Sequence, residues 1–577
     1  MEKFNTYSDQ LITMSWIRRI KRGNQFYLYE CTSERVDGKV KSKMIRYMGV
    51  ESDEIKVPKP ISKRVLPGKI YPDHSLQAGD VTLLWKIAGD LGIVNTIDRY
   101  CIGAEQVSGP TPGKYLTTWA INRIIDPESA TQLDSWVRCT TIPELAGMEP
   151  EDFSKDSFLR SLDSLCSFVK ISNRIKTNIP TIEDQLYQKW RQINPLPIQT
   201  PENLAFDLTA IPTFGETCPL AELGSKARDI HRNQVNLSIL TSKYDSYPIS
   251  QFVHPGSYHS ITTINDLVVR LKDFQLFGGT IVWDRGYTTQ EEIHKLEAEG
   301  WKLVCGVTKR TKKVRQIISE TNPPLDPVHL VQTQEMNIYA EKLQNSIFNT
   351  KGAIVVYVNV ERKLKLMLAR NVTLKEISLD LDELKRICEK MEEKTLSEKI
   401  QKIVGKKFSN FISIQIKSGR NGSSFDYEMN EQVRIDAELL DGKYMLYSTD
   451  CSLSASEIVQ TYFEKDFVEK VFRDLKSFEE IGPIRHRLET RVTAIMFVCT
   501  LALRIKVAMR TMMMKNLKNT EITPEFLLKK LSRVQKIDLW VGDSRETWFV
   551  NIQKKTLKML EEMGFDSLFV GKVRPTQ

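Results

Sequence analysis

The stretch between residues 204 and 307 constrains the fold most, because apolar runs alternate there with helical patterns. Short β-branched runs bounded by turn residues predict strands, and apolar residues spaced by three and four predict helices. The predicted order is three strands, a helix, a strand, a helix and a last strand: 204–211, 234–241, 248–253, 263–276, 280–283, 290–299 and 302–307. This order predicts the α/β class, in which helices cover a sheet.

Two of these strands carry an acid where apolar residues are expected. Asp207 interrupts the run Leu204–Ile211 with apolar residues on both sides, and Asp284 follows the run Thr280–Trp283. A carboxylate at such a position is costly unless it is paired or binds a metal ion. Asp284 has a second interpretation as the N-cap of a helix that begins near Thr288. That interpretation is weaker for Asp207.

A third acid lies in a spaced set of polar residues near the C-terminal end. Tyr462, Lys465, Glu469 and Lys476 fall within roughly 60° of one helix face, at about 100° per residue. A core face would not select a carboxylate, two amines and a phenol, whereas a site for phosphates and a divalent metal would. The alternative is a solvated stripe, because other charged residues crowd the same helix.

Asp207, Asp284 and Glu469, with the Tyr-x2-Lys-x3-Glu-x6-Lys pattern around the last, resemble the DDE transposases of prokaryotic insertion sequences. The resemblance is to the cut-and-paste group with a Tyr-Arg-Glu-Lys signature. Lys465 stands where that group has arginine, which keeps the charge but loses the bidentate fork. The resemblance implies a ribonuclease-H-like core with a mixed five-stranded sheet. Asp207 would then lie midway along the first, central strand and Asp284 at the end of the neighbouring fourth strand.

The resemblance also implies a metal-dependent phosphoryl transfer. Two Mg²⁺ or Mn²⁺ ions would be held by Asp207, Asp284 and Glu469, with Asp207 shared between them. The DNA-binding residues would be Tyr462, Lys465, Lys476 and Arg285. The two lysines would neutralise phosphates, Tyr462 would position one, and Arg285 would contact DNA or pair with a carboxylate. We expect double-stranded DNA, as element ends and target, to be the partner, bound by a homodimer.

The 185 residues between Asp284 and Glu469 (469 − 284) are too many for one connection, so an insertion is expected over 308–450. Strand-like runs are predicted at 353–358, 364–369, 411–416 and 444–447, and helices at 381–390 and 396–404. The second part of the core, with the Glu469 helix, is expected over 451–515, after a first part over 202–307.

The sequence patterns of the regions on either side of the core fit more than one role. Residues 1–56 read as a basic β-meander with strands at 16–22, 26–31 and 40–48, whose lysine face either contacts DNA or protects an exposed edge. A linker covers 57–74, and an all-helical domain over 75–193 either binds the DNA ends or serves as a scaffold. Its predicted helices are 81–91, 115–125, 130–137, 158–169 and 183–193. A C-terminal region covers 516–577.

Composition agrees with this reading without establishing it. A net charge of +9 mildly favours a polyanionic partner. Nine cysteines without a Cys-x-x-Cys pair indicate free thiols in a reducing cytosol, which the resemblance implies is prokaryotic. The first residues lack the apolar segment of a signal peptide, and the run Val492–Leu503 is too short to span a bilayer. We expect that run to be a buried core helix, with no membrane partner.

Three functions stay open on the sequence. The first is an active transposase that cleaves element ends and joins them to target DNA. The second is a ribonuclease-H-like nuclease that cuts without joining. The third is a DNA-binding regulator derived from a transposase, disfavoured because the three acids and the signature lysine are all present.

Overall fold

The structure is a computed structural model of the 577-residue chain. It describes residues 15–22, 25–36, 39–50, 70–101, 110–169, 174–214, 217–224, 232–333, 336–343, 347–348, 351–419, 422–464, 473, 484–517, 522–541, 544–569 and 571–576. The chain divides into two compact units. One comprises residues 1–80 and 525–577, and the other comprises residues 81–524.

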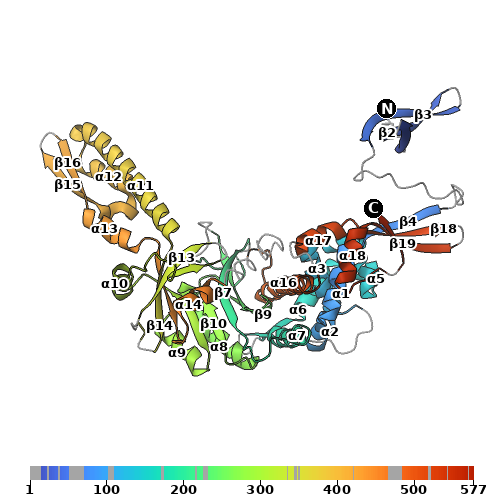
Figure 1. Cartoon of the computed structure of the whole chain (residues 1–577), viewed down its shortest axis with the longest axis horizontal. Coiled ribbons are helices and arrows are strands. Elements are labelled where there is room, and N and C mark those ends of the chain that lie inside the picture. Colours follow the sequence, from blue (N-terminus) through green and yellow to red (C-terminus); the bar gives the residue numbers. More distant parts are fainter. Residues whose placement is uncertain are drawn as a thin grey trace, which may run out of the picture. The chain divides into compact units, whose positions relative to one another are not determined.

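The larger unit is built on a mixed sheet of nine strands, ordered β12-β13-β14-β17-β11-β10-β7-β8-β9 (Figure 1). The strands predicted between residues 204 and 307 are confirmed to within a few residues. They are β7 (Leu204–Pro212), β8 (Gln234–Ser242), β9 (Pro248–Pro255), β10 (Thr280–Trp283) and β11 (Lys302–Val307), with helices α8 (Ile264–Asp273) and α9 (Gln290–Ala298) between them. The β7–β8–β9 run is antiparallel, and β10 pairs in parallel with both β7 and β11.

The sheet was predicted to have five strands, but it has nine among the described residues. Residues from the expected insertion add four strands to the β11 edge: β12 (Leu330–Gln332), β13 (Asn337–Leu343), β14 (Ala353–Val358) and β17 (Lys443–Ser448). The join is antiparallel, with β17 pairing β11 from Val304↔Ser448 to Val307↔Met445. An unpaired β11 would expose its N–H and C=O groups, and β17 satisfies them.

The rest of the insertion forms a subdomain with its own core. Helix α11 (Val360–Ile387) packs on α12 (Glu393–Phe408) and on the hairpin β15–β16 (Ile412–Gly419, Gly422–Met429) (Figure 1). The predicted strand at 364–369 was wrong, because those residues lie inside α11. Apart from Lys365 the run is apolar, as in a buried strand, but leucine, lysine, methionine and alanine favour helix. The Asn359 side chain caps the helix by accepting from the Arg362 N–H.

Helices α10 (Lys312–Glu320) and α13 (Glu431–Leu440) pack against each other, and α14 (Ala455–Phe463) follows β17.

The region before the sheet is largely helical. Its helices are α1 (Gly79–Asp90), α2 (Ile93–Tyr100), α3 (Pro112–Ile125), α4 (Leu133–Arg138), α5 (Ile142–Ala146), α6 (Lys155–Asp163) and α7 (Ile179–Ile193). The expectation of an all-helical region and of a helix over 158–169 needs correction. Helix α6 ends at Asp163, and β5 (Cys166–Val169) pairs with β6 (Arg174–Thr177). The β-branched and aromatic residues of both runs favour this hairpin.

The apolar run Val492–Leu503 lies in α16 (Glu489–Asn516), a core helix as predicted. The full helix is long and apolar enough to cross a membrane by length and composition, yet 94% of its most apolar window is buried inside the protein. It packs against α3, α6 and β9. Its buried Arg504 pairs with Glu183 of α7 at 2.9 Å, and neither side chain is exposed. Removing one member of such a pair would leave an uncompensated buried charge.

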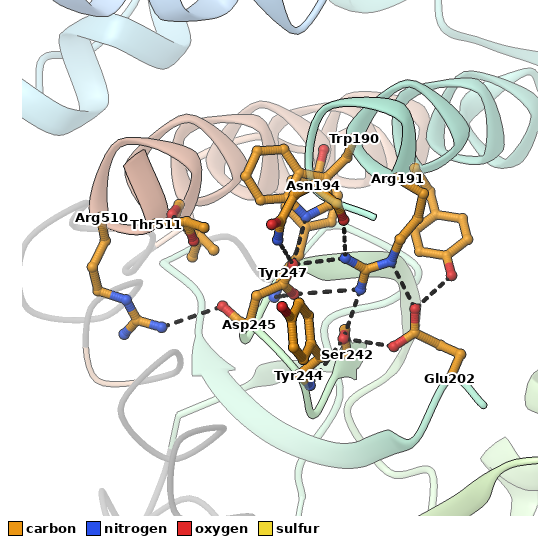
Figure 2. Close-up of polar contacts among 12 residues, drawn as sticks. Trp190, Arg191, Asn194, Glu202, Ser242, Tyr244, Asp245, Tyr247, Arg510 and Thr511 are labelled. Atoms are coloured by element: carbon orange, nitrogen blue, oxygen red, sulfur yellow. Dashed lines mark hydrogen bonds and ion pairs between the residues drawn. The ribbon is translucent and has the colours of Figure 1, made fainter. Parts of the chain in front are cut away.

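A second polar network fastens α7 to the turn between β8 and β9 (Figure 2). Arg191 donates from Nε to Glu202 at 2.8 Å and from Nη1 to Asp245 at 2.7 Å. Its Nη2 donates to Ser242 Oγ at 2.7 Å. Trp190 Nε1 also donates to Asp245, at 2.8 Å. Burial opposes the charge of Arg191, but the hydrogen bonds to Asp245 and Glu202 outweigh it and raise its pKa. Every charge in this network therefore has a partner.

The smaller unit contains two sheets. The predicted meander is confirmed as β1 (Ser15–Arg22), β2 (Gln25–Val36) and β3 (Lys39–Val50), joined in that order. Residues 23–24 and 37–38, which connect these strands, lie outside the described residues. A four-stranded sheet, ordered β20-β19-β18-β4, joins β4 (Ile70–Gln77) to the C-terminal strands β18 (Gln535–Val541), β19 (Ser544–Gln553) and β20 (Lys572–Thr576). Helices α17 (Pro524–Leu531) and α18 (Lys554–Glu562) accompany it.

Candidate active site

Asp207 and Asp284 lie side by side on neighbouring parallel strands. Phe206 of β7 pairs with Trp283 of β10, and each acid is the next residue along its chain. Paired positions on parallel strands point to the same face, and neighbouring strands run about 4.8 Å apart. The backbone of Asp284 is still extended, so both carboxylates belong to one face of the sheet. Asp207 is partly buried and accepts the Leu208 N–H at 2.8 Å.

Asp284 does not cap the following helix. It precedes a single 3₁₀ turn (Arg285–Tyr287) and makes no side-chain cap hydrogen bond. The cap of α9 is Thr289, whose hydroxyl accepts the Glu292 N–H. The N-cap interpretation of Asp284 was therefore wrong, and its side chain is 43% exposed.

Tyr462, the first residue of the signature pattern, contacts the second acid. Its hydroxyl donates to Asp284 Oδ1 at 2.8 Å, although 178 residues separate the two in sequence. The ring is buried in the core that α14 forms with Val282 and Val304. Burial, followed by the charge of Asp284, raises the pKa of Tyr462 well above its usual value. The hydroxyl therefore stays protonated and serves as a fixed donor to the carboxylate.

The position of Gly306 on β11 makes this contact possible. A Cβ built there would lie 2.5 Å from Arg285 Cγ and 2.9 Å from the Tyr462 hydroxyl. Both distances are shorter than real Cβ contacts, so a larger residue would displace the tyrosine or the arginine. Glycine at this point lets α14 and the turn after β10 approach the sheet together.

A group of cations lies beside the acids, around Tyr444 of β17. Arg285 Nε is 4.0 Å from Asp284 Oδ1, and its guanidinium lies 5.5 Å from the centre of the Tyr444 ring. Lys309 Nζ lies 4.7 Å from the same ring and donates to the Leu440 carbonyl at 2.7 Å. Burial, then the charges of Arg285 and Lys443, lower the pKa of Lys309 to about 8. The Asp284 carboxylate thus borders a positively charged rim.

The helix α14 is fixed at both ends. At its start, Ser454 and Glu457 form a reciprocal capping box. At its end, Lys243 donates to the Thr461 carbonyl at 3.2 Å and pairs with Glu464 at 2.8 Å. Three predicted site residues follow directly in the sequence but lie outside the described residues: Lys465, Glu469 and Lys476.

The donor chemistry fits a hard divalent cation. Two carboxylates on one sheet face supply the oxygen ligands that magnesium and manganese prefer. One carboxylate is half-exposed and the other partly buried, so water ligands also have access. Two contributors escaped the sequence analysis in this role, Gly306 and Tyr444. No local pattern marks them, because their importance comes from contacts with segments distant in sequence.

The comparisons with known proteins bear on this site. The family described as "Transposase DDE domain" matches residues 199–505, which is more than half of the chain. No curated protein matches the chain. Among solved structures, the cryo-EM structure of the piggyBac transposase synaptic complex with hairpin DNA is similar over 79% of this chain and 78% of that chain, with 11% identity and a TM-score of 0.37. At that score the likeness does not inform the site. The family match spans both aspartates and the α14 region, and on that match the chain belongs to the DDE transposase family.

Proposed function

We propose that this protein is the transposase of a prokaryotic insertion sequence, in the group with the Tyr-Arg-Glu-Lys signature. It cleaves the ends of the element and joins them to target DNA by metal-dependent phosphoryl transfer. The observation that carries the proposal is the hydrogen bond from Tyr462 to Asp284, next to Asp207 on the neighbouring strand. It brings the signature segment against the pair of acids, as a three-acid site requires.

The sheet order supports a ribonuclease-H-like core. Read from β9 through β8, β7 and β10 to β11, it has an antiparallel run of three strands followed by two parallel ones. In this proposal Asp207, Asp284 and Glu469 would hold two Mg²⁺ or Mn²⁺ ions. Such ions activate an attacking oxygen and stabilise the leaving one in an in-line displacement.

The chain's own residues have separate roles in this proposal. Tyr462 is a positioning residue, because its donated hydrogen bond fixes the orientation of the Asp284 carboxylate. This refines the sequence-based role, in which Tyr462 held a phosphate. Arg285, half-exposed at the same edge, contacts the DNA backbone. Lys465 and Lys476 neutralise phosphates of the cleaved strand.

The first reaction is attack by water at an element end, which breaks a phosphodiester bond and leaves a 3′-hydroxyl. The second is attack by that hydroxyl on a target phosphodiester, which forms the new junction and releases one target strand end. We infer that a homodimer holds two ends in the cytosol of the host cell. The domain boundaries predicted from the sequence, including DNA-end binding by residues 75–193, belong to this proposal.

The test uses DNA that flanks the coding region, which should carry short inverted repeats. Labelled repeat ends are incubated with the protein, Mg²⁺ and a supercoiled plasmid. Cleavage at the repeat followed by joining to the plasmid supports the transposase. Cleavage without joining would instead support the nuclease, and binding without cleavage would support the regulator.

A further inference from the structure

A pocket of about 780 Å³ lies away from the acids, between α3, α6, the segment 484–488 and the start of α16. Its charged lining is unbalanced, with one carboxylate, Glu128, against five cations: Arg123, Lys155, Arg485, Arg487 and Arg491. Only a ligand with several negative charges would match such a surface.

The basic side chains of the pocket differ in whether they form ion pairs with carboxylates of the protein. Arg491 already forms a bidentate ion pair with Asp163, at 2.7 and 2.8 Å. In the part of the chain that the structure describes, no carboxylate pairs with Lys155, Arg485 or Arg487, and all three are exposed. Arg485 stacks over Phe214, with its guanidinium 5.7 Å from the ring centre. The exposed cations therefore form a rim that is held in place yet open to a ligand.

The inner wall of the pocket adds an independent observation. Trp119 of α3 lines it and is only 1% exposed, and its indole N–H meets no acceptor among the described residues. Indole nitrogen is a donor only, and an unsatisfied buried donor is costly. His486, also in the lining, has its pKa lowered to about 4 by burial and then by Arg491 and Arg123. The pocket thus combines a positive field with a donor that lacks its acceptor.

The pocket is connected directly to the strand of the first acid. Ile484 forms a parallel bridge with Thr213, just past the end of β7, and its N–H donates to the Pro212 carbonyl at 3.1 Å. Thr213 is six residues beyond Asp207, so about 20 Å of extended chain separates them at roughly 3.3 Å per residue. Duplex DNA rises about 3.4 Å per base pair, so this distance corresponds to about six base pairs.

We propose that this pocket, with Arg485, Arg487 and Lys155 at its rim, binds the sugar–phosphate backbone of the element-end DNA about six base pairs from the reacting phosphate. The inference rests on the proposed function for its ligand. The exposed cations contact the phosphates of that backbone. The pocket fixes the register of the DNA relative to Asp207 and reads no base.

The test measures DNA affinity by fluorescence anisotropy, with a labelled 40-base-pair duplex and no divalent metal. The full chain carries Asp207→Asn, so that binding is separated from cleavage. The variant Arg485→Gln/Arg487→Gln should bind about 10-fold or more weakly, and the slope of log affinity against log salt should fall by about two, near 0.9 per lost phosphate contact. Arg485→Lys/Arg487→Lys keeps the charge and should keep the slope.

The matched control is Lys272→Gln/Lys302→Gln. It removes the same charge at exposed positions on α8 and at the start of β11, the strand end opposite to the acids. It should change neither affinity nor slope beyond about twofold. Equal losses in the pocket variant and the control would overturn the inference, because net charge alone would then explain them.

A second measurement separates this inference from the proposed function. Once the cleavage site is mapped, single methylphosphonates remove one charge at a time from the duplex. The pocket predicts one sensitive position about six base pairs from the cut, and Arg485→Gln/Arg487→Gln should abolish that sensitivity. Sensitivity that persists in the variant would refute the pocket while leaving cleavage chemistry intact. If the duplex binds through the pocket but is never cut in Mg²⁺, the proposed function fails and the backbone site stands.

Discussion

The Arg191 network and the acid pair at Asp207 and Asp284 both place charged residues beside the same sheet, but they are organised in opposite ways. In the network Arg191 is 12% exposed, and Glu202 and Asp245 are 6% and 4% exposed, each satisfied by several hydrogen bonds (Figure 2). At the acid pair, Asp284 is 43% exposed, and Arg285 Nε lies 4.0 Å from its Oδ1. Burial with full pairing serves stability, whereas partly exposed carboxylates that are fixed from one side suit ligand binding.

The largest expected effect is on catalysis at the acid pair. Asp284→Asn keeps the size of the side chain and an acceptor for Tyr462, but it removes the charge that holds a divalent ion. End cleavage should fall by at least ~10³-fold, which corresponds to about 4 kcal/mol of transition-state stabilisation. DNA affinity and thermal stability should stay close to those of the parent. Gel assays of labelled ends and a melting curve check this, and normal cleavage by the variant would remove Asp284 from the site.

In the Arg191 network, a substitution is expected to reduce stability and to leave cleavage unchanged. Arg191→Met leaves two buried carboxylates without their cation, and unfolding free energy should drop by about 3–5 kcal/mol. Cleavage per folded molecule should be unchanged, since the network does not touch the acids. Denaturant titration measures the loss. The control Arg138→Gln breaks an exposed pair with Glu151 and should leave the unfolding free energy almost unchanged. Similar losses in both variants would mean that the network is not the stabilising feature.

A smaller effect is expected where the two kinds of organisation meet, at Tyr462. Tyr462→Phe keeps the buried ring but removes the donor to Asp284. A hydrogen bond to a charged group contributes about 1.5–3 kcal/mol, so the cleavage rate should fall about 10- to 100-fold with little change in DNA affinity. A positioning role also predicts that the concentration of Mn²⁺ needed for half-maximal cleavage rises. A tyrosine that only fills the core would leave that concentration unaltered.

The smallest effect concerns the cations beside the acids. The pKa of Lys309 is lowered to about 8, so its charge is present below pH 8 and lost above it. DNA affinity should therefore decrease by about 2- to 5-fold between pH 7 and pH 9. Lys309→Arg keeps its charge and should remove most of that decrease. The same lowered pKa makes folding stability rise between about pH 8 and 10.4, because the unfolded chain binds the extra proton there. Parallel pH profiles in parent and variant would show that another group titrates.

The sequence predicted the strands of the acids because their apolar runs are local signals. Asp207 and Asp284 stood out as carboxylates within or directly after those runs. The contacts of Gly306 with Arg285 and Tyr462 were not predictable, since they depend on three segments meeting. The run 364–369 was misassigned because a short apolar run fits a strand or a helix equally well, and its membership of α11 depends on the longer segment around it. The added strands at the β11 edge were missed for a related reason, because pairing partners across long sequence distances leave no local pattern.

The central claim is that Asp207, Asp284 and Glu469 hold divalent ions, and metal-specificity rescue tests it most directly. Each acid is replaced in turn by cysteine, and cleavage of labelled ends is measured in Mg²⁺ and in Mn²⁺. A thiolate binds the softer manganese better than it binds magnesium. The account predicts no cleavage by the cysteine variants in Mg²⁺ and partial recovery in Mn²⁺. Full cleavage in Mg²⁺ by any of the three variants would contradict it.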